Sequence, residues 1–147
     1  MEIINQIKHR LDEAGLKATH PRIVVLKELT ASNEHPSAES IYEGLKEDNP
    51  SISLGSVYRV LDVLVDAGLI QRVLVRSGSK RYDANMSPHG HLYCLKTDKI
   101  QDFYDEELYE LINEFFKKKR IKNFKISEIK LRVNGELIDP EEGISFI

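Results

Sequence analysis

The chain has 147 residues, of which 41% are hydrophobic, and a formal net charge of −3 at pH 7. This length accommodates one domain or two small ones, and no run of about 18 apolar residues predicts a membrane span. The N-terminus lacks the apolar segment of a signal peptide, so we expect a cytoplasmic protein. Because the net charge is negative, any surface that binds nucleic acid must be a local one.

Two helices are predicted at the start of the chain. Apolar residues recur at helical spacing from Ile3 to Leu11, which indicates the first helix. The second helix should begin after Thr19 as N-cap, with Pro21 in its first turn. Its expected buried residues are Ile23, Val24, Leu26 and Leu29.

Two further helices follow. Ser37 is the predicted N-cap of the third, which should bury Ile41 and Leu45 and end at Asn49 and Pro50. The fourth should begin near Ser53 and end with Gly68 at the C′ position. Its expected inward residues are Leu54, Val57, Val60, Leu61, Leu64 and Val65.

A β-hairpin is predicted directly after the fourth helix. The stretch LIQRVLVRSGSKRYDA contains two short strand-like runs around a Ser-Gly-Ser turn. Helices followed by a hairpin at this spacing indicate a winged helix-turn-helix, with the fourth helix as the recognition helix. Its outer face carries Ser56, Tyr58, Arg59 and Asp62. Between Ser53 and Tyr82 the basic residues Arg59, Arg72, Arg76, Lys80 and Arg81 outnumber Asp62 and Asp66, so this region is locally basic.

The rest of the chain predicts a small α+β domain. HLYCLK and KIQDFY read as two strands, DEELYELINEFFKKKR as an amphipathic helix, and FKISEIKLRV as a third strand. We interpret Lys117 to Arg120 as the solvated end of the helix rather than a nucleic-acid contact. One helix covers only one face of such a sheet, so a second copy of the chain is expected to bury the remainder.

Histidines and aspartates gather at the start of this second domain. His89 and His91 would share one face if the strand begins by His89, and Asp102 lies on the adjacent strand. Asp83 ends the hairpin and His35 precedes the third helix. Three nitrogens and two carboxylates suit Fe(II) or Mn(II) better than structural zinc. Each residue also has an ordinary interpretation as a turn, cap or solvated group, and the spacing alone leaves both open.

The sequence resembles the ferric uptake regulator (Fur) family up to about Val133. The matching blocks are LKATHPR, HPSAESIYEGL, SLGSVYRVLDVLVDAGLI, KRYDA, HGHLYC and DKIQDF. The resemblance implies a winged-helix DNA-binding domain at 1–83, a dimerisation and metal-sensing domain at 84–147, and a regulatory metal at their junction. Its ligands would be His35, Asp83, His89, His91 and Asp102.

Within the family the chain looks most like the peroxide-responsive repressors (PerR), because Asp83 and Asp102 are both aspartates where iron-responsive members usually carry glutamates. The subgroup implies Fe(II) or Mn(II), although Zn(II) can fill the site in purified protein. With iron, peroxide would oxidise His35 or His89 and release the protein from DNA.

The chain departs from many relatives at the structural zinc site. Its one cysteine, Cys94, is followed by Thr97 where a C-x-x-C pair would end, so the four-cysteine zinc site is expected to be absent. We interpret Cys94 as a small buried residue, and the apolar ending ISFI as a replacement for the zinc clamp. A further family metal site is also expected to be unfilled, because Pro88, Gly90 and Ile129 stand where its ligands would align.

The sequence therefore predicts a homodimeric, metal-dependent repressor that binds a palindromic DNA operator, senses peroxide and is not an enzyme. The residues expected to contact DNA are Arg22, Ser53, Ser56, Tyr58, Arg59 and Lys80. An iron- or manganese-responsive repressor without peroxide sensing is the first alternative. A non-haem Fe(II) enzyme, which would also use two histidines and a carboxylate, and a DNA-binding protein without metal control are more distant ones.

Overall fold

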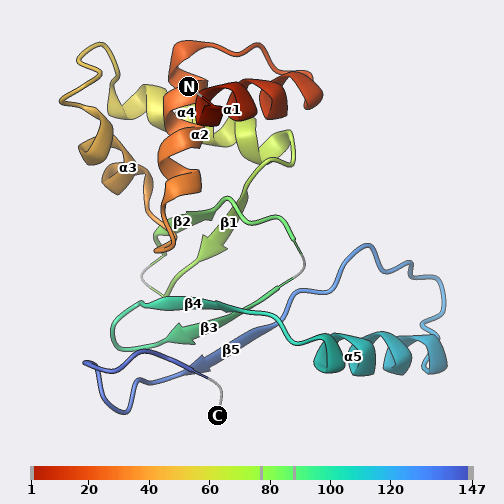
Figure 1. Ribbon diagram of the computed structural model, residues 1–147. Helices are drawn as coiled ribbons and strands as arrows, with labels where there is room; N and C mark the ends of the chain where they lie inside the picture. Colours follow the sequence, from red (N-terminus) through yellow and green to blue (C-terminus); the bar gives the residue numbers. More distant parts are fainter. Residues whose placement is uncertain (1, 77, 88, 146–147) are drawn as a thin grey trace. The chain divides into compact units, whose positions relative to one another are not determined.

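The computed structural model describes residues 2–76, 78–87 and 89–145. The chain divides into an N-terminal unit, Met1–Met86, and a C-terminal unit, Ser87–Ile147 (Figure 1). The domain boundary expected from the sequence lies after Asp83. Among the described residues, no helix is long and apolar enough to span a membrane.

The N-terminal unit consists of helices followed by a hairpin. Its helices are α1 (Glu2–Glu13), α2 (His20–Ala31), α3 (Ala38–Leu45) and α4 (Leu54–Asp66). The strands β1 (Gln71–Leu74) and β2 (Lys80–Asp83) then pair antiparallel, which confirms the predicted hairpin.

Local hydrogen bonds explain where these helices begin and end. The side chains of Ser37 and Ser53 accept hydrogen bonds from the backbone N–H groups of Ser40 and Ser56, so both predicted N-caps are confirmed. Gly68, with φ +76°, ends α4 in the left-handed region that glycine adopts readily. Thr19 precedes α2, but its side chain makes no capping hydrogen bond.

The core of the N-terminal unit differs in detail from the predicted one. Ile41 and Leu45 are buried as expected, but α3 ends at Leu45 because turns, rather than helix, fill the residues before Asn49 and Pro50. On α2, Val25 is fully buried while Ile23 and Val24 are only partly covered. On α4, Leu54 and Val65 lie at the edge of the core. The central residues of α4 are all buried: Val57, Val60, Leu61 and Leu64.

The C-terminal unit contains a three-stranded sheet with the order β4-β3-β5. β3 (Gly90–Cys94) and β4 (Ile100–Phe103) form the predicted hairpin, and β5 (Arg132–Gly135) runs parallel to β3. The prediction of a third strand over FKISEIKLRV was wrong for most of its length. Residues 124–131 alternate in polarity, but they have no ladder partner among the described residues, and only the four residues of β5 pair with β3.

The helix α5 (Glu106–Lys118) does not cover the sheet as expected. Asp105 caps it by accepting from the N–H of Leu108, but none of its described residues is buried, and it extends away from the strands (Figure 1). Instead, the segment after β5 approaches the sheet, where the N–H of Leu137 donates to Cys94 Sγ. The apolar side of α5 is consequently exposed, with Leu111 64% and Phe115 53% accessible.

Gly90 allows β3 and β4 to pair closely at the start of the sheet. A Cβ atom at this position would lie 2.5 Å from Phe103 Cε1 and 3.2 Å from the Leu131 carbonyl oxygen. We therefore expect Gly90→Ala to destabilise the C-terminal unit by about 1–3 kcal/mol, the usual cost of overpacking, measured as a lower urea midpoint. Gly135→Ala is the control, since a Cβ atom added there would meet no atom within 4 Å; equal midpoints for the two variants would contradict the steric account.

Candidate metal-binding and DNA-binding sites

Two of the five predicted metal ligands meet in the N-terminal unit. His35 Nε2 lies 3.3 Å from Asp83 Oδ2, and both side chains are buried. The N–H of Asn85 donates to Asp83 Oδ1 at 2.8 Å, which orients the carboxylate with its other oxygen towards His35. A buried imidazole beside a buried carboxylate provides one nitrogen and one oxygen donor for a metal ion.

The backbone around His35 is held in an uncommon conformation. His35 has φ +54°, a left-handed conformation that costs a non-glycine residue about 1–3 kcal/mol. The guanidinium group of Arg81 donates to the carbonyl oxygens of His35 and of Glu34, the latter at 2.5 Å. The N–H of Tyr82 donates to the Pro36 carbonyl at 3.0 Å. These bonds tie the His35 turn to β2, the strand that ends in Asp83.

The other three predicted ligands meet in the C-terminal unit. His91 on β3 pairs directly with Asp102 on β4. Asp102 Oδ1 lies 3.2 Å from His91 Nε2 and 3.5 Å from His89 Nε2, and the two Nε2 atoms are 3.1 Å apart. Ligands about 2.1 Å from one metal ion at right angles would be about 3 Å apart, so this spacing suits a shared ion.

The hydrogen bonding of His89 leaves its Nε2 atom, the one near His91 and Asp102, available to bind a metal ion. Its Nδ1 lies 2.6 Å from the Ser87 carbonyl oxygen. A carbonyl only accepts, so Nδ1 carries the proton and Nε2 keeps its lone pair in the neutral ring. His89 precedes β3, which begins at Gly90, so the strict strand alternation expected from the sequence does not apply. The two rings nevertheless converge, edge to face, with centroids 4.8 Å apart.

Four of the six residues expected to contact DNA lie along the first turns of α4. Ser53 Oγ and Ser56 Oγ are 2.9 Å apart, and Arg59 Nη2 donates to Ser56 Oγ at 3.4 Å. Tyr58 is 38% accessible. The remaining two lie on other elements, with Arg22 on α2 donating to the Lys17 carbonyl and Lys80 exposed at the start of β2.

The locally basic region is less basic than the sequence suggested. Arg72 forms a salt bridge of 2.5 Å with Asp62, and the hydrogen bond from Arg72 to Asp62 raises the pKa of Arg72. Arg81 is engaged by the His35 turn. The positive charges of Arg72 and Arg81 are therefore partly committed within the protein. Arg59, Arg76 and Lys80 are exposed.

One interaction on this surface was not anticipated from the sequence. The hydroxyl of Tyr58 on α4 donates to Glu39 Oε1 on α3. Glu39 was not singled out, because the two residues are 19 positions apart and belong to different helices. Only the packing of α3 on α4 brings them together.

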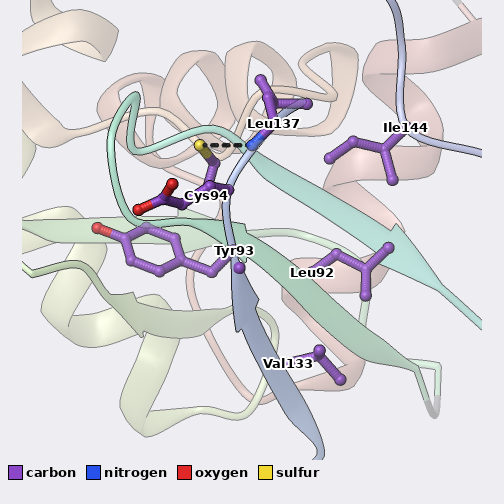
Figure 2. A pocket seen from close by; sticks show the side chains of 8 residues that line it. Leu92, Tyr93, Cys94, Val133, Leu137 and Ile144 are labelled. Atoms are coloured by element: carbon purple, nitrogen blue, oxygen red, sulfur yellow. Dashed lines mark hydrogen bonds between the residues drawn. The ribbon is translucent and has the colours of Figure 1, made fainter. Parts of the chain in front are cut away.

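Cys94 is buried, as expected, beside a small pocket. The pocket has a volume of about 150 Å³ and lies among Leu92, Val133, Leu137 and Ile144 (Figure 2). Hydrogen bonding to the Thr97 side chain, and then to the N–H of Leu137, lowers the pKa of Cys94 to about 7. Cys94 thus lies beside Leu137, and the other residues named around the pocket are apolar. The end of the ISFI segment, residues 146–147, falls outside the described residues.

Comparison with known proteins identifies the family. Residues 13–134 match the ferric uptake regulator family. The chain belongs to this family. It is 35% identical over 115 residues to the peroxide-responsive repressor PerR of Staphylococcus aureus, an alignment that covers 74% of this chain and 78% of the relative.

Solved structures of the ferric uptake regulator family have the same fold. The ferric uptake regulator of Pseudomonas aeruginosa with manganese gives a TM-score of 0.77 at 29% identity, covering 90% of this chain and 98% of that one. The Campylobacter jejuni peroxide stress regulator gives 0.70 at 28% identity, covering 95% and 99%.

Membership of the ferric uptake regulator family settles the architecture and the broad function. The α+β fold combines an N-terminal helical DNA-binding domain with wing strands and a C-terminal α/β dimerisation domain, as predicted. Proteins of this family are metal-dependent transcriptional regulators that bind DNA operators as dimers, and they are not enzymes. The alternative of a non-haem Fe(II) enzyme is thereby set aside.

Proposed function

We propose that the protein is a peroxide-sensing repressor that binds its operator when one Fe(II) or Mn(II) ion is held by His35, Asp83, His89, His91 and Asp102. The observation that carries this proposal is the convergence of His89, His91 and Asp102 within 3.1–3.5 Å of one another. The pair formed by His35 and Asp83 supplies two further donors of the same chemical types.

The donor set favours the proposed metals. Three imidazole nitrogens and two carboxylate oxygens, without sulfur, suit Fe(II) and Mn(II), whereas structural zinc prefers sites rich in thiolate. The 147 residues contain a single cysteine, so one chain cannot supply a four-cysteine site. Zn(II) also accepts histidine and carboxylate and can therefore compete for the regulatory site in purified protein.

Control of DNA binding would follow from linking the two domains. His35 and Asp83 belong to the DNA-binding domain, and the other three ligands belong to the dimerisation domain. An ion bound by all five would restrict the angle between the domains, and with it the spacing of the two α4 helices of a dimer on a palindromic operator. The difference in metal affinity between the linked and unlinked states limits the size of this effect.

The peroxide response is proposed from similarity to the Staphylococcus aureus relative, which is named a peroxide-responsive repressor. Bound Fe(II) would supply the one-electron chemistry that cleaves the O–O bond of peroxide, with no net loss of electrons from the metal, because the histidine ring provides both electrons. In the overall reaction one oxygen atom is inserted into the imidazole of His35 or His89, and peroxide is converted to water. The oxidised ring is a poorer ligand, so the domains would no longer be linked.

Operator binding in four states tests the proposal. We expect Mn(II) and Fe(II) to increase affinity for a palindromic Fur-family operator over the metal-free protein. A small dose of peroxide should release only the iron form, irreversibly, with one oxygen added to His35 or His89 by mass spectrometry. Release by chelator alone, without oxidation, would instead identify a sensor of metal level.

The second candidate function, a repressor that senses the metal level, is also supported by the comparisons and by the sequence. The likeness in fold to the Pseudomonas aeruginosa ferric uptake regulator with manganese gives a TM-score of 0.77, against 0.70 for the Campylobacter jejuni peroxide stress regulator. Arg59 also follows Tyr58, as in many iron-responsive members, so the operator preference does not separate the two candidates. In either case the site of action would be the cytoplasm, where the operator DNA lies.

A further inference from the structure

The contact between Glu39 and Tyr58 lies on the DNA-binding domain, beside the predicted DNA contacts of α4. Tyr58 is 38% accessible and Glu39 is exposed. The tyrosine hydroxyl donates to the glutamate carboxylate. This bond lowers the pKa of Glu39 and raises the pKa of Tyr58, so at neutral pH the carboxylate is ionised and the phenol keeps its proton.

The direction of this hydrogen bond defines what Tyr58 can offer to a base. A phenolic hydroxyl has one proton to donate and lone pairs that accept, whereas an ionised carboxylate only accepts. While the proton is directed to Glu39, the exposed edge of the pair contains acceptors and the aromatic ring, but no donor. In the major groove guanine presents two acceptors, N7 and O6, while cytosine and adenine present amino donors and thymine a methyl group.

We propose that Glu39 is a specificity-determining residue, which directs the hydroxyl proton of Tyr58 away from DNA and so makes Tyr58 discriminate against guanine at the base pair it faces. This inference rests on the proposed operator binding. It identifies guanine as the base that α4 excludes at one position of the operator. Glu39 acts here through Tyr58. It is a positioning residue whose own charge also opposes the approach of phosphates.

The substitution Glu39→Ala, made with and without the Tyr58 hydroxyl, separates the effect of the proton from that of the charge. In Glu39→Ala the hydroxyl is free to rotate and donate to guanine N7 or O6. In a Tyr58→Phe background there is no hydroxyl proton, so any effect of Glu39→Ala there comes from the charge alone. Glu43→Ala is the matched control, because Glu43 lies on the same helix and pairs with Lys46 at 2.7 Å, so this change removes a carboxylate without affecting Tyr58.

The experiment measures binding of the Mn(II)-loaded dimer to a palindromic Fur-family operator in which each base pair is varied singly. At one position guanine should weaken wild-type binding about tenfold, within the range of single base changes. Glu39→Ala should reduce this discrimination to about twofold, while Glu43→Ala should retain it. In a Tyr58→Phe background, Glu39→Ala should alter base preference no further, because the two residues act as a coupled pair.

Full discrimination in Glu39→Ala would overturn the inference. An equal change of base preference on Glu39→Ala in the Tyr58→Phe background would also overturn it, since the charge of Glu39 rather than the proton of Tyr58 would then be responsible. If the wild-type protein shows no Mn(II)-dependent operator binding, the proposed function itself fails, and this inference fails with it. That outcome is recognised from the wild type alone, before any variant is compared.

Discussion

Asp102→Ala is expected to abolish metal-dependent operator binding while leaving a folded dimer. The Oδ1 atom of Asp102 lies within 3.5 Å of both His89 Nε2 and His91 Nε2. Removing this carboxylate takes away the anionic donor, so that only the imidazoles of His89 and His91 remain as ligands in the C-terminal unit. Substitutions that merely disturb the orientation of ligands cost 10–100-fold in metal affinity, so loss of a ligand should cost about 100-fold or more.

Mn(II) titration and operator binding measure this effect together. Gln101→Ala is the control, because Gln101 is an exposed neighbour on the same strand, β4. It should keep wild-type Mn(II) affinity. His89→Ala should behave like Asp102→Ala and should also remove one candidate oxidation target. If Asp102→Ala bound Mn(II) and operator as tightly as the wild type, the ligand assignment would be wrong.

Leu111→Glu combined with Phe115→Glu is expected to convert the dimer into monomers. Leu108, Leu111 and Phe115 follow one side of α5 at helical spacing, and the last two are 64% and 53% accessible in the single chain. Because α5 buries none of its described residues within the chain, we expect this side to lie in the dimer interface. Two carboxylates in an apolar interface should weaken dimerisation about 100-fold or more.

Sedimentation across a range of protein concentrations measures the dissociation constant. Asn113→Glu introduces one charge on the opposite side of α5 and should leave the dimer intact. The double variant should also lose operator affinity, because a palindromic site is bound by two recognition helices together. A double variant that remains dimeric at wild-type concentrations would place the interface elsewhere on the C-terminal unit.

Local signals in the sequence were sufficient for most elements of the fold. The caps at Ser37 and Ser53, Gly68 after α4, and the turn between the hairpin strands each act over a few residues, so a linear pattern records them. The third strand was overestimated because alternation at Phe124 and Ile126 indicates a strand only where another strand pairs with it. The position of α5 was missed because an amphipathic pattern shows that one side is apolar without showing what covers it.

The candidate sites likewise combine contacts that the sequence predicts with contacts that depend on tertiary packing. Pairing of His91 with Asp102 follows from adjacent strands, and was within reach of the sequence. The bonds from Arg81 to the His35 turn and from Tyr58 to Glu39 join residues 46 and 19 positions apart. They depend on tertiary packing, to which neither periodicity nor charge counting is sensitive. In the sequence Arg81 was therefore one more cation of a basic region, and Glu39 resembled any exposed acid of a first turn.

The proposed ligands are divided unequally, three in one unit and two in the other, and this division would select ions by their coordination number. Zn(II) favours four ligands in tetrahedral geometry, and His89, His91, Asp102 and one water would supply them. Zn(II) would then not require His35 and Asp83 as ligands, and could bind without linking the two domains. Ions that favour six ligands would recruit both groups. Zn(II) would accordingly act as a competitive antagonist of repression, even where it binds tightly.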